Sequence, residues 1–285
     1  MNPPRRRLVA PGEVVPLAEA LGPDPSRAER ARVERLRRLV MAETLVVLGV
    51  SLGQSAWYSV LRILERMTRR VPLSQQTSSL NSSVTVGRPW LDLLYQLSDI
   101  VFGLAPAALA VLVMVTFCQP PGGVRRRLGL HGPGWGRDVA SGVILAAIIG
   151  VPGLGLYLGA RALGVNTTVR AADLQSAWWV VPVLLGSAAM NAVVEETVMV
   201  GYLLTRWRQF GWSTTTAVVV SALARGTYHL YQGWGGFVGN IAMGLLLGLV
   251  FVRRGRLLPL VVAHLLLDVV SFVGYSLLAG HVSWL

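Results

Sequence analysis

Lysine is absent from this chain of 285 residues, and all 26 of its basic side chains are therefore arginines. Cysteine occurs once, at Cys118, which excludes an intrachain disulfide. Charged residues make up only 14% of the chain, whereas 53% of the residues are hydrophobic and the mean hydropathy is +0.55. The apolar residues stand in long blocks, several of which approach the ~20 residues that a helix needs to cross a bilayer. This composition excludes an ordinary water-soluble globule and predicts an integral membrane protein.

The positions of the arginines explain the net charge of +12 better than a nucleic-acid partner does. Arginines are concentrated in the N-terminal tail and between apolar blocks, where anionic lipid headgroups attract them. We therefore predict membrane lipid as a partner, no nucleic acid, and a multi-pass location in the cell membrane with a cytoplasmic N-terminus. The arginines between positions 62 and 70 do not follow the positive-inside rule, because this orientation places them on the outer side of the membrane. The predicted cytoplasmic loops carry Arg125–Arg127 with Arg137, Arg206 with Arg208, and Arg253–Arg256.

The apolar blocks predict an all-α, polytopic membrane bundle of about seven transmembrane helices, because the backbone amides of a lipid-embedded segment must be satisfied internally. Residues 1–38 are rich in proline and arginine and lack the apolar stretch of a signal peptide, so we predict a mostly disordered basic tail, in which the run from Ser26 to Arg38 could form a short interfacial helix. Residues 39–285 are the predicted membrane domain, and the polar segment 74–85 is predicted to be an exposed loop. The predicted spans are 39–61, 91–117, 138–161, 176–204, 214–232, 236–252 and 257–280.

Ionisable side chains are costly in a bilayer, so their positions inside the predicted spans are candidates for function. Asn240 in the sixth span is a supporting candidate that could line the same cavity, although an interhelical hydrogen bond is the simpler interpretation. Asp99 stands alone in the second span, where packing or capping is expected. The main candidates, in the fourth, fifth and seventh spans, are Glu195, Glu196, Arg225, His229, His264 and Asp268.

Spacing indicates which of these side chains can share a site. Residues four apart lie on one face of a helix, so His264 and Asp268 point into the same groove, as do Arg225 and His229. The two adjacent glutamates diverge by about 100° on a helix of 3.6 residues per turn. One glutamate can therefore enter a site while the other faces a neighbouring helix.

Three motifs resemble those of the CPBP family of intramembrane proteases, which includes the type II CAAX prenyl endopeptidases and bacteriocin-processing or immunity proteins. The family pattern is a double glutamate followed by an arginine, then Phe-x-x-x-His, then His-x-x-x-Asn or Asp. The resemblance covers about residues 176–280 and implies a catalytic core there. The motifs in this chain are Glu195-Glu196-x-x-x-Val200, Arg225-x-x-x-His229 and His264-x-x-x-Asp268.

Two positions depart from the family pattern. Val200 stands where the family usually has arginine, and Arg225 stands where it usually has phenylalanine. A cation is thus lost from the fourth span and gained in the fifth. We hypothesise that Arg225 pairs with Glu196, because a buried carboxylate without a partner is strongly disfavoured.

The resemblance implies hydrolysis of a peptide bond, with Glu195 as general base and His229 binding or polarising the water. His264 and Asp268 would hold a metal or water, or support the oxyanion. All four side chains are candidate ligands for Zn²⁺, which lowers the pKa of bound water to about 7. In a metal-free alternative, Glu195 and His229 activate the water directly. Because no HExxH motif is present, a metal site would have to be assembled from different spans.

The leading prediction is an intramembrane endopeptidase, a CAAX-like CPBP metalloprotease, acting on a hydrophobic or lipid-modified, membrane-associated peptide or protein. A catalytically silent immunity or partner-binding protein is the alternative, which the loss of arginine at position 200 favours. An ion transporter is a third hypothesis, because chains of carboxylates and histidines also form relays. The clustering of polar residues in the C-terminal half, without a stripe through all spans, argues against transport.

Overall fold

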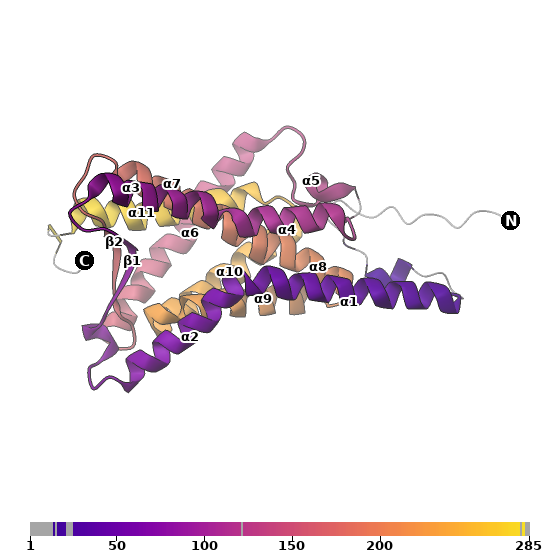
Figure 1. The fold of residues 1–285 in the computed structure, drawn as a ribbon, viewed down its shortest axis with the longest axis horizontal. Coiled ribbons are helices and arrows are strands. Elements are labelled where there is room, and N and C mark those ends of the chain that lie inside the picture. Colours follow the sequence, from indigo (N-terminus) through magenta and orange to yellow (C-terminus); the bar gives the residue numbers. More distant parts are fainter. Residues whose placement is uncertain (1–13, 15, 21–24, 121, 280, 283–285) are drawn as a thin grey trace.

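The computed structural model describes residues 14, 16–20, 25–120, 122–279 and 281–282, and these residues form mainly helices (Figure 1). The predicted class, an all-α membrane bundle, is confirmed. The elements are η1 (Leu17–Ala20), α1 (Arg27–Gly49), α2 (Leu52–Thr68), η2 (Leu73–Gln75), β1 (Thr77–Ser82), α3 (Pro89–Gly103), α4 (Ala105–Thr116), α5 (Gly123–Arg127), α6 (Trp135–Ala162), β2 (Thr168–Asp173), α7 (Val180–Glu195), the π-helix η3 (Glu196–Tyr202), α8 (Leu203–Phe210), α9 (Thr214–His229), η4 (Leu230–Gln232), α10 (Trp234–Arg254) and α11 (Leu258–Leu278).

Five helical segments of the described chain are long and apolar enough to cross a bilayer, or six if α1 and α2 together count as one bent span. These segments are α3 with α4, α6, α7 through α8, α10, and α11. The fifth predicted span contains α9, which has only 16 residues. Such a helix rises about 24 Å, less than the ~30 Å of a hydrocarbon layer. Among the described residues, five or six helical segments therefore have the length and apolarity to cross a bilayer, where we predicted about seven.

The first predicted span is a bent pair of helices. The Ser26 hydroxyl accepts a hydrogen bond from the Glu29 N–H, and the Glu29 carboxylate accepts one from the Ser26 N–H. This capping box starts α1 at Arg27, inside the predicted tail 1–38 and in the run where a short interfacial helix was the alternative, but the helix continues to Gly49. The chain breaks after Gly49 and continues as α2, bent by 52° from α1.

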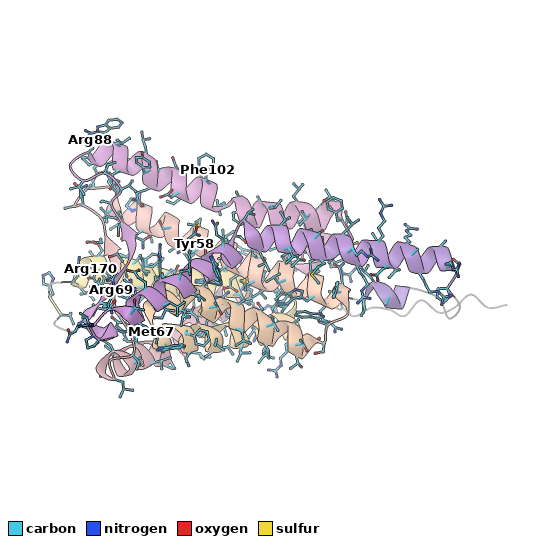
Figure 2. All side chains as sticks on the ribbon, turned by 60° about the horizontal axis from the view of Figure 1, so that its bottom comes forward. Tyr58, Met67, Arg69, Arg88, Phe102 and Arg170 are labelled. Carbon is cyan, nitrogen blue, oxygen red and sulfur yellow. The ribbon has the colours of Figure 1, made fainter. Side chains whose placement is uncertain are left out.

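The outside of the bundle carries apolar side chains that a water-soluble protein would bury. Exposed examples are Trp57 and Tyr58 on α2, Phe102 on α3 and Val151 on α6. Figure 2 shows the labelled side chains of Tyr58 and Phe102 on the outer surface. So large an apolar surface is suited to contact with acyl chains rather than with water.

Two short parallel strands connect helix ends on the side of the molecule where α2 ends and α3 begins (Figure 1). β1 pairs with β2 in a register that sets Thr77 opposite Thr168. β1 lies inside the segment 74–85, which we predicted to be a loop. That segment is rich in serine and threonine and lacks the apolar alternation that signals a strand.

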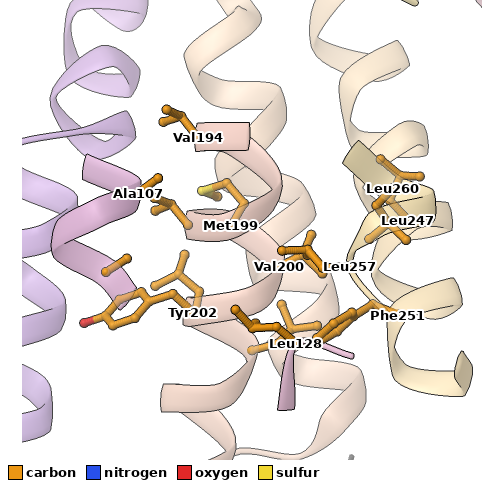
Figure 3. Packing of buried hydrophobic residues seen from close by; sticks show 14 of the residues in the cluster. Ala107, Leu128, Val194, Met199, Val200, Tyr202, Leu247, Phe251, Leu257 and Leu260 are labelled. Carbon is orange, nitrogen blue, oxygen red and sulfur yellow. The ribbon is translucent and has the colours of Figure 1, made fainter. Parts of the chain in front are cut away.

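The π-helix η3 lies at the centre of the apolar core. All seven of its residues are buried, and Met199, Val200 and Tyr202 belong to the main cluster of buried hydrophobic side chains. Figure 3 shows Met199 near Ala107 of α4, and Val200 on the side of η3 that faces Leu257. Short π-helices are rare and frequently occur at functional sites. In this chain the π-helix begins directly after Glu195.

Candidate active site

Two adjacent glutamates mark the junction of α7 and η3. Glu195 is the last residue of α7, Glu196 is the first of η3, and both side chains are buried. α7 packs against α3 and α11, so the junction is enclosed by other helices. It also lies in the middle of the membrane-crossing segment Val180–Phe210. Carboxylates at this depth need partners.

Glu196 is held by one guanidinium and one imidazole from two other helices. Nη2 of Arg225, on α9, lies 2.5 Å from Oε1 of Glu196. Nδ1 of His264, on α11, lies 2.8 Å from the same oxygen. The side chains of Glu196 and Arg225 are 0% and 1% exposed. The hypothesis that Arg225 pairs with Glu196 is therefore confirmed.

Glu195 lies opposite two histidines. Its Oε2 is 3.7 Å from Nε2 of His229 and 3.9 Å from Nε2 of His264. The Tyr228 hydroxyl donates a hydrogen bond of 2.6 Å to this same oxygen, and Nη1 of Arg225 lies 3.6 Å away. No donor from the described part of the chain reaches the other oxygen, Oε1. The carboxylate is thus anchored through one oxygen only.

Asp268 joins this cluster from the next turn of α11. Its Oδ1 lies 3.8 Å from Nε2 of His264, and the Asn191 side-chain amide of α7 donates to its Oδ2 over 3.1 Å. The structure therefore brings Glu195, His229, His264 and Asp268 around one space. Their catalytic roles stay predictions.

The separations between Glu195 and the two histidines are compatible with a bridging water molecule. Distances of 3.7 and 3.9 Å are too long for direct hydrogen bonds and are of the size that a shared water spans. Nε2 of His229 is buried and has no hydrogen-bond partner among the described residues. Its Nδ1 lies 3.4 Å from the side-chain amide of Gln232. Because buried polar atoms are normally paired, Nε2 is a candidate water-binding atom.

The predicted zinc site finds no support in this arrangement. Within the described ranges, no group of three or more His, Cys, Asp and Glu side chains is placed so that it could hold a metal ion. Oε2 of Glu195 is engaged by Tyr228, and Oδ2 of Asp268 by Asn191. The side chains as they stand do not fit a resident zinc ion, and Zn²⁺ stays a prediction.

Three other positions from the sequence lie outside the cluster. Val200 is part of the apolar core, and Arg225 on α9 supplies the cation that the family has at that position. The Asn240 side chain donates to the carbonyl of Gly236 in its own helix over 2.9 Å. No polar contact joins Asn240 to the other candidates in the part of the chain that the structure describes, and its supporting role stays a prediction. Asp99 is exposed on α3.

Sequence reasoning missed three residues of the site. Asn191 precedes Glu195 by four residues, so its position on the same helical face was a usable signal. Tyr228 and Gln232 flank His229 but carry no charge, and the search for ionisable groups passed over them. All three became visible only through their contacts with Glu195, His229 and Asp268.

The comparison with known families bears on the region that contains these side chains. Residues 177–270 match the family model described as Type II CAAX prenyl endopeptidase Rce1-like. No curated protein and no solved structure matches the chain. The match spans the whole cluster, from Asn191 to Asp268. The resemblance predicted from the motifs is thereby confirmed, and residues 177–270 of this multi-pass membrane chain are similar to the CAAX-type protease family.

Proposed function

We propose that this protein is a membrane-embedded endopeptidase in which Glu195 activates a water molecule for attack on a peptide bond. The observation that carries the proposal is the position of Oε2 of Glu195, 3.7 Å from Nε2 of His229 and 3.9 Å from Nε2 of His264. A carboxylate and two imidazoles from three different helices thus meet within 4 Å of one oxygen atom. The match to a CAAX-type protease family supports protease activity in general.

The nucleophile in this proposal is a water held between Glu195 and His229. Glu195 accepts one proton as the water oxygen bonds to the carbonyl carbon. The same carboxyl group then gives that proton to the leaving nitrogen as the carbon–nitrogen bond breaks. Tyr228 keeps the carboxylate in position through its hydrogen bond to Oε2.

His264 is placed to stabilise the negative charge that develops on the carbonyl oxygen. Its Nδ1 donates to Glu196, and its Nε2 faces Glu195 and Asp268. In the protonated ring, which these carboxylates favour, Nε2 is also a donor. A donor fixed in advance by buried partners needs no reorganisation during the reaction. Asp268, itself held by Asn191, orients this imidazole from the next turn of α11.

The surroundings of the site indicate the class of substrate. Glu195 lies in the middle of the membrane-crossing segment Val180–Phe210, and the outer surface of the bundle is apolar. The proposed substrate is therefore a hydrophobic or lipid-modified peptide or protein associated with the cell membrane. The cytoplasmic side is the proposed location of the N-terminus.

The proposal is tested with protein purified in detergent and a fluorogenic apolar peptide. Wild type is expected to hydrolyse the peptide, and Glu195→Gln and His229→Ala to lower kcat by about 100-fold or more, the usual contribution of acid–base catalysis. Asp99→Asn is the matched control, since it makes the same carboxylate-to-amide change on the exposed face of α3. Equal hydrolysis by wild type and Glu195→Gln would remove the assignment.

The predicted zinc ion is tested on the same sample. Metal analysis that finds zinc in stoichiometric amount, together with loss of hydrolysis after chelation and recovery with added Zn²⁺, would support it. Full activity in zinc-free protein would leave the direct route through Glu195 and His229.

A further inference from the structure

The open edge of β1 is a polar surface that the proposed chemistry does not use. Within the described chain the sheet contains only β1 and β2, so β1 is paired on one side. Arg66 of α2 covers the first residue of this edge, donating to the Thr77 carbonyl over 3.1 Å. Gln96 of α3 covers the last, donating to the Ser82 carbonyl over 3.1 Å. Ser79 lies between these two contacts and is exposed.

The strand pairing determines which backbone groups face this edge. The N–H of Thr168 donates to the carbonyl of Gln76, so that carbonyl points toward β2. Backbone groups alternate in direction along the continuously paired residues Thr77–Ser79, so those of Thr77 and Ser79 point away from β2. Leu80 has no partner in the register and interrupts the alternation, so the Ser82 carbonyl also faces away from β2. The contact of Arg66 with the Thr77 carbonyl agrees with this direction. No hydrogen bond from outside the sheet reaches the backbone of Ser79 among the residues described.

The edge lies beside the segment that follows His229. The buried Ser78 hydroxyl donates to the carbonyl of Tyr231 over 3.2 Å. The N–H of Tyr231 donates in turn to the Ser59 hydroxyl of α2 over 2.7 Å. β1, the middle of α2 and the residues just after His229 are therefore in direct contact. Figure 1 shows β1 running between the end of α2 and the beginning of α3.

We propose that the backbone of Ser79 binds the substrate peptide as an added strand at this edge, an inference that rests on the proposed function. A peptide bond inside a helix is shielded by neighbouring turns, so a membrane substrate must unwind before attack. Unwinding leaves N–H and C=O groups that lipid cannot satisfy. The N–H and C=O of Ser79 can form hydrogen bonds with the unwound backbone of a peptide that lies about 4.8 Å from β1, the usual distance between paired strands. Such strand addition is a general mode of peptide recognition.

The edge is tested by binding, separately from hydrolysis. In a Glu195→Gln background, the Kd of a fluorescein-labelled apolar peptide is compared between Ser79→Pro and Ser79→Ala. Both variants lose the hydroxyl, but only proline removes the N–H, and an edge strand accepts proline where that N–H is outside the ladder. Ser79→Pro is expected to bind about three- to tenfold more weakly, the effect of one backbone hydrogen bond. Thermal unfolding of both variants checks that the fold is retained.

A scan of peptides N-methylated at one position at a time tests the same edge with β1 unaltered. The Ser79 carbonyl is one acceptor between the occupied carbonyls of Thr77 and Ser82, so weaker binding is predicted for N-methylation at one peptide position and not at the two adjacent positions, whose N–H groups face the other way. Equal Kd values for the two Ser79 variants, or an equal N-methyl effect at adjacent positions, would overturn the proposal. So would a changed oligomeric state of Ser79→Pro at unchanged peptide affinity, which would assign the edge to a second copy of the chain. If wild type does not hydrolyse the peptide but the position-specific N-methyl effect is seen, only the proposed function fails.

Discussion

At the scale of single residues, Glu196 shows how this chain compensates for its departures from the family pattern. Valine at position 200 removes a cation from the helix that carries the glutamates. Arg225 restores it from α9, and His264 adds a second partner from α11. Three elements are thereby joined at one carboxylate oxygen. Because Arg225 replaces the missing cation, the valine at position 200 is not by itself an argument for a catalytically silent protein.

Removing the cation should destabilise the fold through Glu196. Arg225→Met is expected to lower the free energy of unfolding by about 3–5 kcal/mol, because it leaves a buried carboxylate without its charged partner. The double variant Glu196→Gln/Arg225→Met should lose less than the sum of the two single variants. Unfolding of the three variants in detergent measures this, and fully additive losses would count against the pair.

The hydroxyl of Tyr228 should matter for catalysis more than for binding. Tyr228→Phe removes the hydrogen bond to Oε2 of Glu195 without creating a large cavity. We expect kcat to fall by about three- to tenfold, which corresponds to one hydrogen bond, at nearly unchanged KM. Steady-state kinetics on the fluorogenic peptide measure both constants. A rise in KM at constant kcat would show that the hydroxyl binds substrate instead.

Much of the site could be predicted because its members are ionisable residues within long apolar blocks, and such residues are easily recognised in a sequence. The spacing of His264 and Asp268 gave their shared face, and the odd pair of Val200 and Arg225 indicated the ion pair. The contacts of Tyr228 and Asn191 could not be predicted, since neutral polar residues are common in membrane helices. Which oxygen of Glu195 is anchored depends on side-chain geometry that no pattern encodes.

At the scale of elements, Arg206 of α8 connects helices that are distant in the sequence. We predicted it in a cytoplasmic loop, but its side chain is fully buried. It pairs with Glu43 of α1 at 2.5 Å. Carbonyls at a helix end, such as those of Phe117 and Cys118 after α4, lack a partner within the helix, so the arginine satisfies them and fixes α8 to α1 and α4. It donates to the carbonyls of Val113, Phe117 and Cys118 at the end of α4.

Replacing this arginine by lysine should destabilise the bundle although the charge is kept. A lysine ammonium cannot reproduce the planar fork of donors, so several buried acceptors would lose their partner. Arg206→Lys is expected to lower the free energy of unfolding by about 2–3 kcal/mol. Arg208→Lys is the control, because Arg208 donates to the single carbonyl of Trp212, and about 0.5 kcal/mol is expected there. Equal losses for both variants would contradict the role of Arg206.

Among the elements, the membrane helices could be predicted and the irregular ones could not. Length and apolarity determine a membrane helix, and each predicted span contains a helix, although α9 in the fifth is too short to cross a bilayer. The π-helix η3 has no sequence signal, because its residues are ordinary helix-core residues held by their neighbours. β1 and β2 depend on pairing across 91 residues, from Thr77 to Thr168, which local patterns do not reveal.

At the scale of the whole molecule, the arginines at the end of α2 explain why the charge rule and the topology disagreed. Arg66 donates to the Ser78 hydroxyl over 2.6 Å and to the Thr77 carbonyl, and Arg69 pairs with Glu65. Arg66 thus binds β1, and Arg69 forms an ion pair within α2. Their presence on the predicted outer side therefore does not argue against a cytoplasmic N-terminus.

The orientation can be measured with single cysteines in a Cys118→Ser background. Ser82→Cys and Arg126→Cys lie beyond opposite ends of the membrane-crossing segment Pro89–Thr116. With a cytoplasmic N-terminus, an impermeant maleimide should label Ser82→Cys in intact cells and Arg126→Cys only after permeabilisation. The reverse labelling pattern would show that the N-terminus lies on the outer side of the membrane.

The proposal that Glu195 and His229 act on one water molecule is tested most directly by the kcat of Glu195→Gln, of His229→Ala and of the double variant. Residues that act as a unit give losses that do not multiply. The double variant is therefore predicted to be about as slow as the slower single variant. A double variant whose loss equals the product of the two single losses would contradict a shared water.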